Sequence, residues 1–189
     1  YINANSSAIS GVITDGGKFK WDIEKYPSMK DFKKFGPFAY TAKLRNGLFR
    51  NTGACLSPQN AFYNSIRMER ICSNARKLAE FFNSEYSDIT VNYPGLENSK
   101  WHDIAKEQFG ENAGGIITIR TGSKEKAFGI INALKLPLIV SNIGDTKTLV
   151  IHPESTLNVH STEEEKKTAG VFDDLIRISV GIEDIEDLI

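Results

Sequence analysis

Arg177 is the residue whose type and position most clearly suggest chemistry. It lies in the middle of the apolar run Leu-Ile-Arg-Ile-Ser-Val at residues 175–180. An always-charged guanidinium is costly to bury unless a fixed anion meets it. That anion could be an acid of the protein itself, such as Asp145, Asp173 or Glu183, or the carboxylate of a ligand held by two parallel hydrogen bonds. Structural ion pairs produce the same pattern, so the run alone leaves both interpretations open.

A second candidate is the segment Ser-Asn-Ile-Gly-Asp at residues 141–145, which follows an apolar stretch. Ligands in α/β proteins commonly bind in loops at the carboxyl ends of strands. Asn142 offers both amide donors and an acceptor, although the local sequence favours an Asx turn that serves only the backbone. His152 has no recognisable partner for a nucleophilic triad, and no grouping of His, Cys and acids has metal-ligand spacing.

The composition is that of an ordinary globular protein. Among 189 residues, 40% are hydrophobic and 25% are charged, with a net charge of −1. No basic excess points to nucleic acid or to an anionic membrane surface, and no apolar stretch is long enough to span a bilayer. Cys55 and Cys72 form no spaced framework. Free thiols in a reducing compartment, the cytoplasm, are therefore the expectation.

Periodicity predicts the elements that must position these residues. Ser57-Pro58 is typical of a helix start, and apolar spacing continues the helix to Phe82. The spacing is interrupted between Ile66 and Met68, which suggests a kink or a register shift. The alternation in 175–180 places Arg177 on the opposite strand face from its isoleucine neighbours. An α/β organisation follows, with a boundary near residue 75. Strands are expected at 9–14, 88–93, 115–120, 136–141, 148–151 and 175–180, and further helices at 38–50, 101–109, 123–134, 162–169 and 182–189.

Three longer motifs carry a resemblance to a known family. They are Ser141-Asn-Ile-Gly-Asp-Thr-Lys-Thr-Leu-Val-Ile-His-Pro-Glu-Ser-Thr156, the segment Gly170–Asp184 with its Asp-Leu-Ile-Arg-Ile-Ser-Val-Gly-Ile-Glu-Asp, and Gly53–Phe62. Together with Arg67-Met-Glu-Arg70, they resemble the pyridoxal-phosphate-dependent trans-sulfuration enzymes, which are cystathionine γ-synthase-like. The Asn-x-Gly-Asp before His-Pro is similar to the O-acetylhomoserine sulfhydrylase branch.

The resemblance implies a fold and a place for this chain within it. It implies the end of the large pyridoxal-phosphate-binding domain of an aspartate-aminotransferase-like, fold type I enzyme at residues 1–74. Residues 75–189 would then form the C-terminal α/β small domain with a mainly antiparallel sheet. The chain is expected to be a segment of a longer polypeptide. The Schiff-base lysine is expected just before Tyr1, so no catalytic residue is assigned in this chain.

The resemblance also implies site residues and partners. Arg177 corresponds to the arginine that binds the substrate carboxylate, Asn142 helps to hold that carboxylate, and Ser141 and Thr156 belong to a substrate loop; no metal is expected. The substrates would be O-acetyl-L-homoserine and sulfide or a thiol, giving homocysteine or methionine, in a homotetramer built of dimers. Methionine γ-lyase or cystathionine γ-synthase chemistry is the enzymatic alternative. An isolated structural or oligomer-forming fragment without the lysine is the non-enzymatic one.

Overall fold

The computed structural model describes residues 1–3 and 8–189 of the chain. These residues divide into two compact units, Ile9–Ala61 and the larger unit of Tyr1–Ala8 with Phe62–Ile189. The boundary expected from the sequence, between residues 74 and 75, does not coincide with this division. It concerns a longer polypeptide and stays a prediction.

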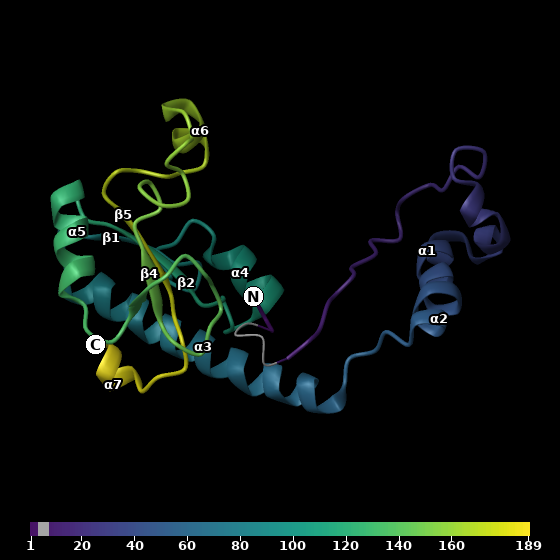
Figure 1. The fold of residues 1–189 in the computed structure, drawn as a ribbon, viewed down its shortest axis with the longest axis horizontal. Helices are drawn as coiled ribbons and strands as arrows, with labels where there is room; N and C mark the ends of the chain where they lie inside the picture. The colour runs from purple at the N-terminus through teal and green to yellow at the C-terminus, as the bar shows by residue number, and fades with distance from the viewer. Residues whose placement is uncertain (4–7) are drawn as a thin grey trace. The chain divides into compact units, whose positions relative to one another are not determined.

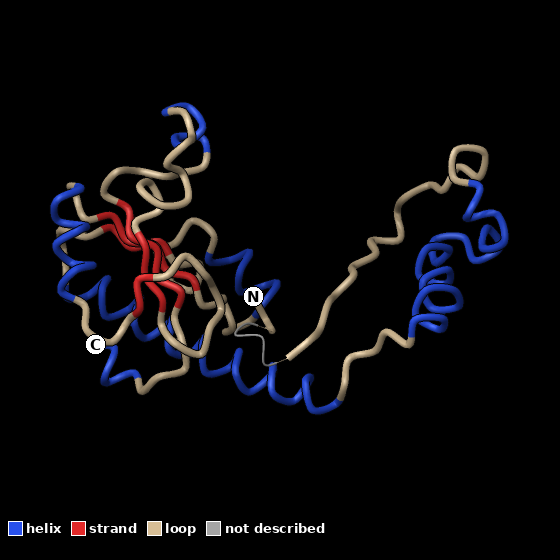
Figure 2. Tube along the Cα trace, in the orientation of Figure 1, coloured by secondary structure: helices blue, strands red, loops and turns tan. Residues whose placement is uncertain are grey.

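The larger unit is built on one five-stranded sheet (Figures 1 and 2). The strand order is β1-β2-β5-β4-β3, in which only β3 and β4 run parallel. The predicted α/β class with a mainly antiparallel sheet is therefore confirmed. The strands are β1 (Thr90–Asn92), β2 (Ile116–Arg120), β3 (Leu138–Ile139), β4 (Leu149–Ile151) and β5 (Leu175–Ser179).

Helices cover one face of this sheet. Alternate residues of β2 and β5, including Ile117 and Ile178, join the core formed with α3, α5 and α7. Leu175, Arg177 and Ser179 lie on the opposite strand face, as the period of two requires. The helices of the unit are α3 (Pro58–Glu85), α4 (His102–Phe109), α5 (Lys124–Ala133), α6 (Glu163–Thr168) and α7 (Ile185–Leu188).

Side-chain caps begin three of these helices where the sequence predicted them. Ser57 Oγ accepts from the backbone N–H of Asn60 at the start of α3, at 3.1 Å. Ser123 does the same for α5, and Thr162 forms a reciprocal capping box with Glu165 at the start of α6. Each cap satisfies backbone donors that a helix leaves without internal partners.

The predicted kink in α3 is wrong, because the helix runs without interruption over 28 residues. Its buried face contains Asn64, Arg67, Ile71 and Asn74, at regular helical spacing, while Ile66 on another face is exposed. The apolar spacing in the sequence is interrupted because polar side chains, among them Asn64 and Arg67, lie on the inner face of the helix. The backbone itself is regular.

The smaller unit is helical and loop-rich. It contains the 3₁₀ segment η1 (Pro27–Phe38), α1 (Ala39–Lys43), the π-helical turn η2 (Leu44–Phe49) and α2 (Arg50–Thr52), so the helical prediction at 38–50 is confirmed. Gly36 interrupts η1 with φ 54°, a left-handed conformation that glycine adopts without penalty. The strand predicted at 9–14 is wrong: none of the strands in the described residues pairs with it.

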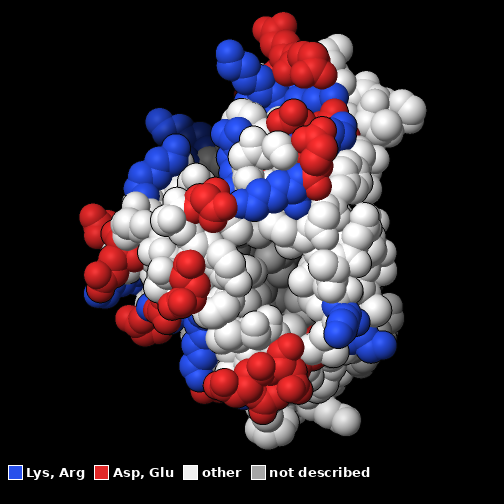
Figure 3. All heavy atoms as spheres, turned by 90° about the vertical axis from the view of Figure 1, so that its left-hand side faces the viewer, with Lys and Arg blue, Asp and Glu red and all other residues white. Residues whose placement is uncertain are grey.

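The charged surface is mixed in sign. On the face shown in Figure 3, Lys and Arg side chains are interspersed with Asp and Glu. Within the described ranges, no helix combines the length and apolar character that crossing a membrane requires.

Candidate functional site

Arg177 occupies the centre of β5, between Thr118 of β2 and Ile151 of β4. Its Nη2 donates to the backbone carbonyl oxygen of Ser141 at 2.7 Å and to that of Asn142 at 3.3 Å. The fold therefore brings together three of the residues predicted for the site. The contact from Asn142 comes from its backbone, and its side chain belongs to an exposed residue.

The guanidinium has no acidic partner in the part of the chain that the structure describes. None of the ion pairs there includes Arg177. Glu183 accepts from Thr148, and Asp145 accepts from the backbone N–H of Lys147. The structural ion pair considered from the sequence is thus not formed with these acids.

Two features distinguish the surroundings of the Arg177 guanidinium. Its Nε is buried and has no hydrogen-bond partner among the residues that the structure describes. Burial lowers the pKa of the guanidinium from its ordinary value, but an arginine stays protonated in proteins. A buried donor without a partner costs about 1–3 kcal/mol of stability.

The loop at residues 141–145 is fixed to the sheet and to α3. The backbone N–H of Gly144 donates to Ser179 Oγ at 2.8 Å. The carbonyl oxygen of Gly144 accepts from Arg67 Nη1 at 2.5 Å. Gly144 has φ 70°, a conformation that favours glycine. These contacts hold the two carbonyls that face Arg177.

Arg67 is a buried residue that contacts the loop at residues 141–145 and was not among the residues predicted for the site. It was noted only as part of the Arg-Met-Glu-Arg motif, yet it is 2% exposed. The sequence does indicate that Arg67 faces inward, because Asn64, Arg67 and Ile71 lie three and four residues apart, on one helix face. A charged residue on the inner stripe of a helix indicates a specific partner.

A second network supports the end of β5. Asn74 Nδ2 donates to the carbonyl oxygens of Gly181 and Glu183, at 3.1 and 2.9 Å. Thr148 Oγ1 donates to Glu183 Oε2 at 2.9 Å and accepts from the backbone N–H of Gly181 at 3.0 Å. Because this network anchors the residues that directly follow β5, it helps to hold the strand that carries Arg177.

Thr156 and His152 form a separate local turn. Thr156 Oγ1 donates to the carbonyl oxygen of His152 at 2.8 Å. The His152 ring is buried, with Nδ1 2.9 Å from Ser155 Oγ and Nε2 2.7 Å from the carbonyl oxygen of Asp173. The hydrogen bonds of Thr156 stay within this turn, so its predicted place in a substrate loop stays a prediction. His152 serves packing and turn geometry.

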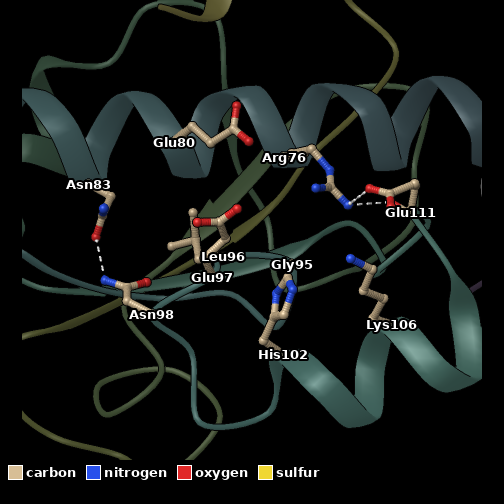
Figure 4. A pocket seen from close by; sticks show the side chains of 10 residues that line it. All are labelled: Arg76, Glu80, Asn83, Gly95, Leu96, Glu97, Asn98, His102, Lys106 and Glu111. Atoms are coloured by element: carbon tan, nitrogen blue, oxygen red, sulfur yellow. Dashed lines mark hydrogen bonds and ion pairs between the residues drawn. The ribbon is translucent and has the colours of Figure 1, made fainter.

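A polar cavity of about 510 Å³ lies elsewhere in the larger unit, between α3 and α4 (Figure 4). Arg76 pairs with Glu111 at 2.8 Å on one side, and Asn98 donates to Asn83 at 3.1 Å on the other. His102, from α4, also lines it. None of the predicted site residues lines this cavity. In the described residues, no group of three His, Cys, Asp or Glu could hold a metal ion.

The family and the relatives that match this chain cover all of its residues. A family described as Cys/Met metabolism PLP-dependent enzyme matches residues 1–189. The chain is 38% identical to an O-acetyl-L-homoserine sulfhydrylase of Corynebacterium glutamicum, over 100% of this chain and 48% of that protein. It is 42% identical to an L-methionine gamma-lyase of Fusobacterium nucleatum subsp. polymorphum, over 100% of this chain and 45% of the relative. The chain thus spans about half the length of these curated relatives.

A solved structure agrees with the sequence relatives. A putative O-acetylhomoserine (thiol)-lyase from Campylobacter jejuni subsp. jejuni superposes with a TM-score of 0.64 at 36% identity. The match covers 79% of this chain and 37% of the solved one, which carries N'-pyridoxyl-lysine-5'-monophosphate.

Proposed function

Because this chain belongs to the Cys/Met metabolism PLP-dependent enzyme family, we propose that it is the C-terminal portion of an O-acetylhomoserine sulfhydrylase. In the complete protein the reaction replaces the acetate on the γ-carbon of O-acetyl-L-homoserine with sulfide or a thiol. The products are homocysteine or methionine, together with acetate. The contribution of this chain is recognition of the amino acid's α-carboxylate.

The proposal rests on the guanidinium of Arg177, which forms no ion pair with an acid of the described residues. It is held from one side by the carbonyls of Ser141 and Asn142, and its Nε has no partner in the described ranges 1–3 and 8–189. A carboxylate matches the remaining donors, because arginine presents them in a planar fork. Every amino-acid substrate carries this α-carboxylate, independently of the group on its γ-carbon.

The cofactor implied by the family is pyridoxal 5'-phosphate, and the donor set of this chain fits an amino acid bound to it. Arg177 would hold the carboxylate of that amino acid, beside the backbone of Ser141 and Asn142. When bound, pyridoxal phosphate supplies the electron sink for negative charge that develops on the substrate carbon. Fixing the carboxylate limits rotation of the substrate about its α-carbon. The α-hydrogen is thereby kept in one orientation toward the base that removes it.

The test compares two reactions of the complete, cofactor-loaded protein. With O-acetylhomoserine and sulfide, we expect homocysteine and acetate in equal amounts, measured by chromatography. With methionine alone, little methanethiol or 2-oxobutanoate should form. The opposite preference would replace the proposal with γ-lyase chemistry, for which the 42% identity to the Fusobacterium nucleatum enzyme is the supporting observation.

The complete protein is also expected to assemble from several identical chains. We infer a homotetramer built of dimers, in the cytoplasm, with residues 1–74 completing the large domain and 75–189 forming the small one. Light scattering of the complete protein should give four times the mass of one chain. A monomeric mass would contradict this assembly.

A further inference from the structure

Arg67 is an unusual residue because it buries a full positive charge in the middle of α3. It is 2% exposed, and no acid forms an ion pair with it within the described ranges. Arginine is seldom fully buried without a partner, because removing the charge from water is costly. Its compensation here comes from backbone carbonyl oxygens that accept from Nη1 and Nη2, while its Nε has no hydrogen-bond partner among the described residues.

These carbonyls belong to two segments that are far apart in the sequence. Nη1 donates to Gly144 at 2.5 Å, across 77 positions. Nη2 donates to Tyr1 at 2.9 Å, across 66 positions, and also to Ile2. One planar group therefore joins the start of the described chain to the loop at residues 141–145. A lysine could not reproduce this arrangement, because its ammonium is a single point rather than a fork.

Contacts with other residues also hold both segments, Tyr1–Ile2 and the loop at residues 141–145, in place. The phenol of Tyr1 approaches the backbone so closely that a Cβ built at Gly115 would lie 2.1 Å from its oxygen. Gly144 is held from its other side by Ser179. Two residues before Gly144, the carbonyl of Asn142 meets Arg177. A short path of hydrogen bonds and backbone thus leads from Tyr1 through Arg67 to the partners of Arg177.

We propose that Arg67 is a positioning residue: it sets the loop at residues 141–145 at a fixed distance from the segment Tyr1–Ile2. The inference rests on the proposed function, in which Arg177 binds the carboxylate, and on the place just before Tyr1 that the family resemblance implies for the cofactor-bearing lysine. Under that arrangement, Arg67 sets the distance between the carboxylate site at Arg177 and the segment Tyr1–Ile2 without touching the substrate.

The main variant is Arg67→Lys in the complete holoenzyme, and Arg70→Lys is the matched control. Arg70 lies three residues further along the same helix, is exposed, and makes one bond, to the carbonyl of Glu183 at 3.2 Å. We expect R67K to raise KM for the amino-acid substrate about 10- to 100-fold, because small displacements of a bound substrate are costly. R70K should keep the wild-type KM, and both variants should keep the wild-type circular dichroism.

A second measurement does not depend on turnover. Glycine, which carries the carboxylate but no γ-leaving group, is titrated while the cofactor absorption band is followed. Its dissociation constant should rise in R67K by a factor similar to that of KM. Hydrogen exchange of peptides covering residues 141–145 should become faster in R67K and stay unchanged in R70K.

The outcomes separate the inference from the proposed function. If the wild type fails to make homocysteine but R67K still weakens glycine binding and loosens the loop, the proposed function is wrong and the positioning role stands. A folded R67K with wild-type KM, glycine binding and exchange would overturn the role. If R67K does not fold, Arg67→Gln, which leaves no buried charge, is measured in the same way. Failure of both to fold would assign Arg67 to stability alone.

Discussion

The guanidinium of Arg177 donates to the backbone carbonyl of Ser141 at 2.7 Å, although 36 positions separate the two residues. The contact uses only Nη2, which also meets Asn142. It orients the plane of the guanidinium, and Nε has no partner within the described part of the chain. The partners of the side chain are neutral carbonyls, and no acid in the described part of the chain forms an ion pair with its charge.

Replacing Arg177 with Lys should damage substrate binding more than stability. The ammonium keeps the charge but cannot hold the Ser141 carbonyl and a bidentate carboxylate together. A lost hydrogen bond to a charged group is worth about 1.5–3 kcal/mol, which corresponds to about a 10- to 100-fold fall in kcat/KM. Steady-state kinetics of the complete enzyme measure this. Unchanged kinetics would remove Arg177 from the site.

Replacing Asp174 with Asn should produce a pH-dependent loss of stability. Asp174 is buried, and burial alone raises its pKa, but hydrogen bonds from Arg120 Nε at 2.8 Å and the backbone N–H of Gly122 at 3.0 Å lower the net pKa. A lowered pKa stabilises the fold above the ordinary aspartate value of 3.8, and this contribution is lost as pH falls below it. We expect D174N to cost about 1–3 kcal/mol at neutral pH.

Urea unfolding of the wild type and D174N across a pH series checks this. The difference between them should be constant at neutral and mildly acidic pH and should shrink below about pH 3.8. A difference that grows toward low pH would contradict the assigned sign.

Adding a methyl group at Gly181 should destabilise the protein by about 1–3 kcal/mol, as overpacking typically does. A Cβ there would lie 2.4 Å from the carbonyl oxygen of Thr146 and 2.6 Å from the backbone carbon of Lys147. Gly129→Ala is the matched control, since a Cβ at this glycine within α5 meets nothing within 4 Å. It should stabilise by about 0.5–1 kcal/mol. Thermal melts of both variants should therefore shift in opposite directions.

Cys72 should resist alkylation in the folded protein. It is 2% exposed, and burial raises the pKa of its thiol above the ordinary value of 9.0. Thiolate is the reactive form, so both effects slow the reaction. Iodoacetamide labelling with peptide mapping, which separates Cys72 from Cys55, should show modification of Cys72 mainly after unfolding in urea. Rapid labelling at neutral pH without urea would show that this part of α3 opens readily.

The sequence alone determined the local elements and the residue types of the site. Ser57-Pro58 and Ser123 mark helix starts because their hydroxyls satisfy free backbone N–H groups within a few residues. The alternation around Arg177 gave its strand and its face, since side chains of a strand alternate regardless of what lies beside it. The motif containing Asn142 indicated the family.

Tertiary structure decided what these residues contact. The extended residues 9–14 have strand-like composition, but a strand exists only where another strand accepts its hydrogen bonds. The interrupted apolar spacing near Ile66 suggested a kink, but it marks Asn64 and Arg67 turned inward toward partners from distant segments. Burial of a charge depends on acceptors supplied by the whole fold, such as the carbonyls of Gly144 and Tyr1. No local pattern in α3 encodes their positions.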